Sequence, residues 1–539
     1  MTRLVGVVLA LALPALGFPA PCAAEAPRQI VMGIETDPRS LNPVLFRGGT
    51  EFDLLWQIYD SLFELGHDLV PRPVLAESVQ VSRDGLTYTI RLKSGVTWHD
   101  GKPFTAEDVA FTIREHLNPA NASSWRSNFH AFVGFPELTA KENPVPYESL
   151  PRKPVEVLDR HTVRLNLRYP YAPLLTVLVS PQGAILPRHL LEGQSLNTAE
   201  FNRKPIGTGP FRLVEWRRGE RLVLEANPDY HRGRPALDRV IMQIIPEMTV
   251  RLAQLESGGI QFLRSPAPDA IPAIRRNPRL TTLFGEDVNF RGIVFQLEHP
   301  ALADRRVRQA IAFAIDTKTI RQTLGRGYMT EANGPIPPSS WAYTTKVKPT
   351  PYDPERARRL LAEAGYSAGR DGVLVKDGRR LSLGLVVEVY ENLVDVAAAI
   401  QQQLKTVGVE VSVEPLEFGA WSDRFMKGAY DLLLLASAGS VDPDPISYSL
   451  FRTGQPRNTN GYSNPRVDEL LDRARSARTQ TERKALYAEF VEILDEEKPI
   501  HVLYHQQRWY AFDRRYKGFE HLGVSAGVLQ SLRRVRFQP

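Results

Sequence analysis

The sequence predicts a mixed α/β protein that is divided into more than one lobe. Its 539 residues exceed what a single hydrophobic core usually holds, so two or three lobes are expected. Segments with the two-residue apolar alternation of strands occur along the chain together with segments of helical periodicity. Hydrophobic residues make up 43% and charged residues 24% of the chain, as in ordinary soluble globular proteins.

The first 24 residues predict an export signal. Arg3 supplies a positive charge, residues 4–13 form an apolar stretch, and the chain then reads Cys22-Ala23-Ala24, the small residues that a signal peptidase accepts. We therefore expect residues 1–24 to be a signal peptide that is removed after Ala24. The alternative is a lipid on Cys22, the only cysteine, although Pro19 and Pro21 fit that poorly. No later apolar run approaches the roughly 18 residues needed to span a bilayer.

The mature chain begins with clear strand and helix patterns. Residues 29–34, QIVMGI, predict a strand, and residues 37–43, DPRSLNP, predict a loop because two prolines interrupt regular structure. Residues 51–65, EFDLLWQIYDSLFEL, have the apolar spacing of an amphipathic helix.

The stretch TWHDGKPFTAEDV poses a choice between a catalytic centre and a structural joint. Residues 86–93 before it alternate apolar and polar side chains and predict a strand, and Asp100 with the following glycine predicts a turn after a second short strand. Thr105 stands where a helix N-cap belongs, with Asp108 three residues later to accept its amide hydrogen. We therefore interpret the stretch as a joint, with His99 as the alternative working group.

The second half of the chain predicts alternating helices and strands. Helices are expected at residues 305–324, 355–364, 392–407 and 465–478. Strands are expected at residues 381–389, 409–414 and 431–436.

Two patterns in the sequence match catalytic or metal-binding motifs, but the residues around them exclude those functions. Residues 523–527, GVSAG, match the G-x-S-x-G nucleophile elbow, but that motif needs a later acid and histidine, and the last twelve residues contain neither Asp, Glu nor His. His501 and His505 are four residues apart, but they lie on a predicted strand rather than on one face of a helix. We therefore predict no catalytic residues and no metal site.

Cofactors and nucleic acid are not expected either. The sequence contains neither a phosphate-binding loop nor a dinucleotide-binding glycine motif, so no nucleotide cofactor is predicted. The net charge is +6, but Lys and Arg are dispersed among Asp and Glu. Without a basic strip to follow a phosphate backbone, nucleic acid is not a predicted partner.

Several segments together resemble the family 5 extracytoplasmic solute-binding proteins, the receptors of peptide, nickel and related ABC importers. They occur in the order that the family has and extend over nearly the whole mature chain. The matching segments are DPRSLNP (37–43), YDSLFEL (59–65), residues 75–113, IGTGPFRLVEW (206–216), NPDYHRGRPALDRV (227–240), RRVRQAIAFAID (305–316), DPERARRLLAEAGY (353–366) and GYSNPRVDELLDRAR (461–475).

The resemblance implies a type II periplasmic binding protein fold, with two hinged ligand-gripping lobes and an extra peripheral lobe. The implied division is lobe I at residues 25–72, 200–292 and 508–539, peripheral lobe II at 73–199, and lobe III at 293–507. Residues 292–297 and 500–504 are the implied crossover strands between the gripping lobes, and both are apolar enough to be buried.

The implied function is that of a periplasmic receptor without enzymatic activity. It captures a peptide-like or other bulky polar solute by closing its cleft, and delivers it to an ABC permease in the inner membrane. The resemblance is compatible with a monomer. The competing hypothesis is an exported hydrolase with an unrecognised site, and recovery of chemically unchanged ligand would decide between the two.

Ligand contacts are expected on the inner faces of the two gripping lobes. On lobe I, the resemblance places Phe46 and Arg47 beside the ligand, although Phe46 as core and Arg47 as a solvated charge are equally plausible. On lobe III, Trp341, Trp421 and Tyr448 offer aromatic faces, although ordinary packing is the more frequent role of such side chains.

The loop after GAYD (428–431) lacks the residue that would hold the amino terminus of a peptide ligand. Peptide receptors of the family place an Asp in this region to pair with the ligand's ammonium group, but residues 432–441 contain no acid, base or aromatic residue. Asp442 is the first carboxylate, so either it has taken that role or the ligand lacks the ammonium. The alternative is that this loop points away from the cleft. Ser437 and Ser440, among small neighbours, predict a roomy pocket with neutral hydrogen bonding.

Overall fold

The computed structural model describes residues 28–47, 49–121, 123, 125–140, 142–179, 181–326, 328–437, 440–523 and 527–538. The expected signal peptide, Cys22 and the central serine of the GVSAG match, Ser525, lie outside these residues. Within the described ranges, none of the helices has the length and apolarity to cross a membrane.

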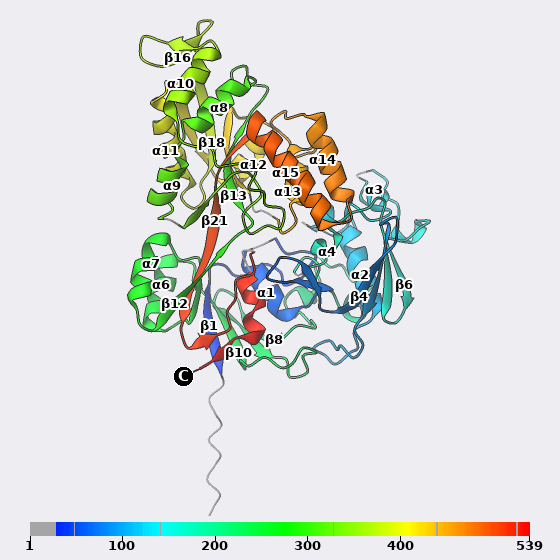
Figure 1. Cartoon of the computed structure of the whole chain (residues 1–539). Helices are drawn as coiled ribbons and strands as arrows, with labels where there is room; N and C mark the ends of the chain where they lie inside the picture. The colour runs from blue at the N-terminus through cyan, green and yellow to red at the C-terminus, as the bar shows by residue number, and fades with distance from the viewer. Residues whose placement is uncertain are drawn as a thin grey trace, which may run out of the picture.

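A mixed sheet of twelve strands runs through the upper and lower parts of the molecule (Figure 1). Ten strands follow the order β19-β18-β20-β13-β21-β11-β1-β10-β9-β8, and β12 and β14 pair with β21. Their bounds are β1 Gln29–Ile34, β8 Phe211–Arg217, β9 Arg221–Ala226, β10 Arg239–Ile244, β11 Phe262–Arg264, β12 Leu280–Glu286, β13 Phe290–Phe295, β14 Met329–Glu331, β18 Ser382–Glu388, β19 Glu410–Leu416, β20 Leu432–Ser437 and β21 Ile500–Asp513.

Strand β21 joins the upper and lower parts of Figure 1. Its first part pairs antiparallel with β13, and its second part pairs antiparallel with β12, which precedes β13 in the chain. The predicted crossing strands are therefore present: residues 292–295 lie in β13, two residues short of the predicted end, and residues 500–504 lie in β21, and both runs are buried. They are two adjacent polypeptide connections between the parts that we call the upper unit and the lower unit.

The upper unit covers both faces of its sheet with helices (Figure 1). One apolar core lies under α8, α10 and α11, and a second lies under α12 to α15. The helices are α8 Arg305–Phe313, α9 Thr317–Thr323, α10 Pro354–Glu363, α11 Leu393–Lys405, α12 Phe418–Met426, α13 Asp444–Phe451, α14 Pro465–Ser476 and α15 Gln480–Glu497.

The single helix expected at residues 305–324 is wrong, because the structure has two helices there. The side chain of Asp316 accepts the amide hydrogen of Thr319 and caps α9, which starts a new helix after Phe313. The other predicted helices and strands of the upper unit agree with the structure to within one or two residues at each end.

The lower unit packs its strands between two further cores. Its helices are α1 Thr50–Ile58, α6 Met248–Ser257, α7 Ile271–Arg276 and α16 Gly527–Gln530. The helix expected at residues 51–65 is wrong in its length, because α1 ends at Ile58 and residues 63–65 form strand β2. The amide of Gly209 donates to the Ile58 carbonyl at 2.9 Å, so a distant segment contacts the carboxyl end of α1.

A third part, the side unit, has its own sheet and core at the right of Figure 1. The sheet has the order β4-β5-β7-β6, and helix α2 packs beside it. These elements and their neighbours are β2 Phe63–Leu65, β3 Pro71–Pro73, β4 Ala76–Val81, β5 Thr87–Leu92, α2 Ala106–Leu117, α3 Phe135–Thr139, β6 Val155–Asp159, β7 Thr162–Asn166, α4 Leu174–Val177 and α5 Arg188–Leu191.

The interpretation of TWHDGKPFTAEDV as a structural joint is confirmed. Thr105 caps α2, and its amide donates to Asp108 at 2.8 Å in a capping box. His99 accepts from the Gly207 amide through Nδ1 at 3.2 Å and donates through Nε2 to the Gly209 carbonyl at 3.0 Å. His99 therefore connects the side unit to the lower unit. The second short strand is reduced to one bridge, between Thr97 and Pro103.

The remaining elements are short. They are β15 Ser367–Ala368, β16 Leu374–Lys376, β17 Arg379–Arg380, β22 Tyr516–Lys517, β23 Arg536–Phe537, and the 3-10 turns Arg126–Phe129, Tyr147–Ser149, Glu200–Asn202, Pro268–Ala270 and Leu532–Arg534.

Candidate ligand-binding cleft

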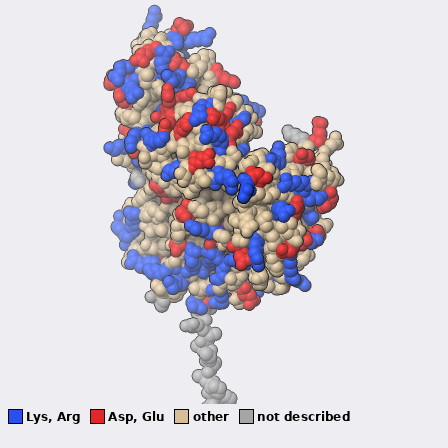
Figure 2. Space-filling view, turned by 45° about the vertical axis from the view of Figure 1, so that its right-hand side comes forward, with Lys and Arg blue, Asp and Glu red and all other residues tan. Residues whose placement is uncertain are grey.

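The carboxyl ends of two sets of parallel strands face the junction between the upper and lower units. In the upper unit β18, β19 and β20 are parallel, and β20 ends at Ser437 beside Phe290, where β13 enters that unit. In the lower unit β1, β10 and β11 are parallel, and β11 ends at Arg264 beside Tyr510. Ligands of open α/β sheets bind at such carboxyl ends. Figure 2 shows a recessed seam at this junction.

The lower side of the junction carries a buried charge pair. Arg264 donates to Asp53 at 2.8 Å, and Glu35 lies 3.7 Å from the same guanidinium. Burial raises the pKa of Asp53 to about 6, although Arg264 opposes the shift. Thr50 and Phe262 help to line a small cavity around this pair.

The crossing strands carry a second charged cluster. Arg508 on β21 donates to Asp287 at 2.8 Å, and Arg291 on β13 donates to Gln506 at 2.7 Å. Glu391, from the turn after β18, lies 3.2 Å from Arg291 and 3.7 Å from Arg508. Burial alone would raise the pKa of Glu391, but the two guanidinium groups hold it below its usual range.

The upper side of the junction carries two closed ion pairs. Arg483 on α15 donates to both carboxylate oxygens of Asp442, at 2.7 and 2.6 Å. Arg475 on α14 donates to both oxygens of Asp444 at 2.9 Å. All four side chains are nearly or completely buried. Such bidentate pairs are strong and have a fixed geometry.

The same region of the upper unit contacts the side unit. The amide of Ala172 donates to the Arg475 carbonyl at 2.9 Å, and the Arg475 guanidinium lies 5.6 Å from the Tyr171 ring centre. Arg478 donates to the Arg83 carbonyl at 3.1 Å. The upper unit therefore touches the side unit as well as the lower unit.

Four of the residues predicted from the sequence lie around the two closed ion pairs. The Arg475 guanidinium lies 3.2 Å from the ring centre of Tyr448, and the Arg483 guanidinium lies 4.9 Å from that of Trp341. Asp442 is the partner of Arg483. Ser440 lines a small cavity whose other walls include Val288, Phe290, Ile336, Ser340 and Ser447.

The other predicted contacts are placed differently. Phe46 is fully buried and stacks on Trp125 with ring centres 5.0 Å apart. Arg47 is exposed, and its amide donates to Glu51 at 3.0 Å. Trp421 is buried in α12 against Phe425, within the core under α12 to α15. Ser437 is buried at the end of β20.

The charged residues at the strand ends were missed by the sequence analysis. A usable signal existed for two of them, because Arg291 interrupts the apolar run of β13 and Arg508 lies within β21. A charge inside a buried strand requires a partner. For Glu35, Asp53 and Glu391 no comparable pattern exists, since acidic residues near turns and helix starts are ordinary.

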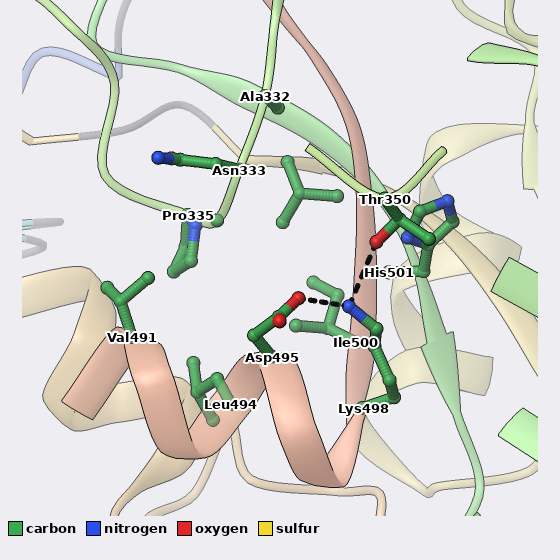
Figure 3. Close-up of a pocket in the computed structure, with 12 residues that line it drawn as sticks. Ala332, Asn333, Pro335, Thr350, Val491, Leu494, Asp495, Lys498, Ile500 and His501 are labelled. Carbon is green, nitrogen blue, oxygen red and sulfur yellow. Dashed lines mark hydrogen bonds and ion pairs between the residues drawn. The ribbon is translucent and has the colours of Figure 1, made fainter. Parts of the chain in front are cut away.

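A separate cavity lies inside the upper unit, between α15 and residues 332–350 (Figure 3). Lys498 points toward Thr350, to which its ammonium donates at 3.0 Å, and toward Asp495, with which it also pairs. Its charged groups are thus paired with each other, away from the junction. In the described part of the chain, no three His, Cys, Asp or Glu side chains are grouped so that they could hold a metal ion.

Comparisons with known proteins agree on one family. The model for bacterial extracellular solute-binding proteins, family 5 Middle, matches residues 70–459. Di/tripeptide-binding protein 2 of Pseudomonas aeruginosa is 30% identical over 533 residues, covering 95% of this chain and 96% of that protein.

Two solved structures are similar over nearly the whole chain. NikZ from Campylobacter jejuni in complex with Ni(L-His) is 28% identical with a TM-score of 0.77, covering 95% of this chain and 100% of that one. The oligopeptide-binding protein AppA from Bacillus subtilis in complex with a nonapeptide is 28% identical with a TM-score of 0.75 and the same coverage.

Proposed function

The chain belongs to the bacterial extracellular solute-binding proteins of family 5, and we propose that it is the periplasmic receptor of an ABC importer. It captures a peptide-like or other bulky polar solute between the upper and lower units and delivers it to a permease in the inner membrane. We propose further that it acts as a monomer and catalyses no reaction. The peptide-binding relative and the AppA complex with a nonapeptide support the ligand class.

One observation carries the proposal: two sets of parallel strand ends with charged side chains face each other across a junction that two strands cross. Two adjacent strands are a flexible connection, so the units can rotate about β13 and β21. A ligand that touches both faces stabilises the closed arrangement by its higher affinity for it. A permease can then distinguish the loaded form from the empty one.

We propose a division into three lobes, which we compare with the hydrophobic cores of the lower, side and upper units. Lobe I is residues 25–72, 200–292 and 508–539, the peripheral lobe II is 73–199, and lobe III is 293–507. The cores of the three units support this division in outline. Packing departs from it at the border of lobes I and II, because residues 62–69 pack in the side-unit core and residues 186–199 pack in a lower-unit core.

We propose that the ligand is not held by a free amino terminus at the loop after β20. Asp442, the first carboxylate in that region, already accepts two hydrogen bonds from Arg483, and Asp444 accepts two from Arg475. An ammonium group would have to displace a guanidinium, and a buried charge without its partner costs several kcal/mol. An oligosaccharide, a blocked peptide or another bulky polar solute meets no such requirement.

The ligand contacts that we propose on the upper face are Ser440, Trp341 and Tyr448. The Ser440 hydroxyl is beside a cavity, and the two aromatic rings pack on the guanidinium groups of the closed ion pairs. The pairs hold these rings in place, so the face is rigid before the ligand arrives.

Native mass spectrometry of protein purified from its own periplasm tests the function. We expect the protein to carry a bound solute. Denaturation should release this solute in chemically unchanged form. Incubation with that solute should give no product, whereas turnover would support the exported hydrolase and reject the receptor.

A further inference from the structure

Glu391 has an unusual backbone conformation at the junction between the two units. It lies in the turn between β18 and α11, and its φ is +50° although it is not a glycine. A non-glycine residue in this left-handed region is energetically unfavourable unless its surroundings hold it there. Its side-chain contacts are therefore expected to hold it there.

The Glu391 carboxylate closes over two arginines that come from different crossing strands. It lies 3.2 Å from Arg291 and 3.7 Å from Arg508, and Gln506 donates to it at 2.7 Å. The Arg291 side chain is 3% exposed and that of Arg508 is 18% exposed, whereas that of Glu391 is 26% exposed. Glu391 is thus the solvent-facing member of the cluster.

The other acid of the cluster is fixed by its surroundings. The Asp287 side chain is 1% exposed and accepts from Arg508, from Asn289 and from the amide of Val288. Two guanidinium groups and one fixed carboxylate leave one positive charge, which Glu391 neutralises. The Arg291 Nε is also buried without a hydrogen-bond partner among the described residues, so the arginines have donor capacity to spare.

We propose that Arg291 and Arg508 form an anion subsite of the ligand cleft, and that Glu391 occupies it until a carboxylate or similarly sized anionic group of the ligand takes its place. The inference rests on the proposed receptor function and specifies the ligand's chemistry. Exchange of one carboxylate for another keeps both guanidinium groups paired, so they are not left buried and uncompensated. Glu391 is free to leave its unfavourable φ when the ligand replaces it.

The position suits a ligand that bridges the two units. Arg291 is on β13, at the edge of the upper unit, while Arg508 pairs through β21 with Gly285 of β12 in the lower unit. Three further titratable or charged groups interact electrostatically with this cluster. They are Glu388 and Tyr390, beside Glu391, and Arg264 at the end of β11. An anion held here contacts the very strands about which the units rotate.

Chemical rescue tests the subsite without knowledge of the natural ligand. The thermal midpoints of the wild type, Glu391→Ala, Glu391→Gln and Glu388→Gln are measured while acetate replaces chloride at constant ionic strength. Acetate should raise the midpoint of both Glu391 variants by several degrees. In Glu391→Ala it fills the vacated position, and in Glu391→Gln it displaces a neutral amide that does not compensate the charge of the two arginines. The wild type and Glu388→Gln should respond much less, since Glu391 still competes in both. Glu391→Gln, nearly the same shape, decides the result if Glu391→Ala does not fold.

Equal responses of all four proteins would overturn the subsite and make Glu391 a structural contact only. The solute recovered from the periplasm should also carry at least one acidic group, and an uncharged or purely cationic solute would overturn the assignment. Failure of the rescue leaves the receptor function standing. Turnover of the solute, by contrast, would reject the receptor function and leave the rescue unaffected.

Discussion

Arg483 and Asp442 form a closed pair in which both carboxylate oxygens accept from the guanidinium, at 2.7 and 2.6 Å. The Arg483 side chain is 7% exposed and that of Asp442 is 3% exposed. The pair joins α15 to the loop before α13, and Asp444 at the start of α13 makes a second such pair with Arg475 on α14. The upper face of the cleft is therefore held by buried charges that compensate one another.

Asp442→Asn should destabilise the protein by about 3 kcal/mol, because it turns a carboxylate oxygen into a donor facing a buried guanidinium. Thermal or urea unfolding measures the loss. The matched control is Asp472→Asn, whose own side chain is exposed and whose partner Arg452 is partly exposed, so its midpoint should hardly change.

Acetylation of a bound peptide should leave its affinity unchanged, because Asp442 and Asp444 are both occupied by arginines. Calorimetry with free and N-acetylated peptide pairs makes the comparison. A large loss on acetylation that Asp442→Asn reproduces would show that an amine is recognised at this loop after all.

Gly207→Ala should disrupt the contact between residues 206–210 and α1. A Cβ at this position would lie 1.8 Å from the Ile58 carbonyl oxygen, which is backbone and cannot rotate away. We expect a destabilisation of more than about 3 kcal/mol, in the range of severe overpacking. Gly419→Ala is the control, since a Cβ there meets nothing within 4 Å and lies within a helix. Similar unfolding curves for the two variants would contradict the steric argument.

The stability of the protein should fall as the pH falls from about 6.5 toward 4. Burial lowers the pKa of His505 to about 4, and the neutral ring donates to the Asn289 carbonyl at 3.0 Å. The unfolded chain, with a histidine pKa near 6.5, binds the proton first, so protonation favours unfolding over this interval. The loss is up to about 1.4 kcal/mol per pH unit for this histidine.

Burial also lowers the pKa of His501, to about 3, so it adds to the same trend. His505→Gln should therefore reduce the slope of the unfolding free energy against pH by the contribution of one bound proton. An unaltered slope in His505→Gln would show that this ring takes up its proton at the same pH in the folded protein as in the unfolded chain.

The two units should close around β13 and β21 when the right solute binds, because a cleft that releases ligand to a permease must also reopen. Small-angle scattering should show a smaller radius of gyration with bound solute than without. An unchanged radius at saturation would count against rotation about these strands.

Exported protein should begin at Glu25. The motive is the apolar stretch of residues 4–13 followed by Cys22-Ala23-Ala24. Intact-mass measurement on secreted protein checks the cleavage point, and a mass that includes diacylglycerol on Cys22 would establish the lipid-anchored alternative.

Local signals in the sequence predicted most elements, because their causes are local. The alternation in β5 and the capping box of Thr105 with Asp108 depend on neighbours within a few residues, and both are present. The break between α8 and α9 was equally local, at Asp316, but the apolar spacing on either side concealed it. The end of α1 at Ile58 was not local, since residues 207–209 contact it.

The sequence by itself determined the strand and helix content, the two buried crossing strands and the resemblance that implied a solute receptor. Only the tertiary structure decided which charges meet. Arg483 finds Asp442 from 41 residues away, and Arg508 reaches Asp287 from 221. Whether a carboxylate is free for a ligand depends on which cation it meets in the fold. The sequence does not identify the partner of a charged residue, because electrostatic pairing depends on distance in space.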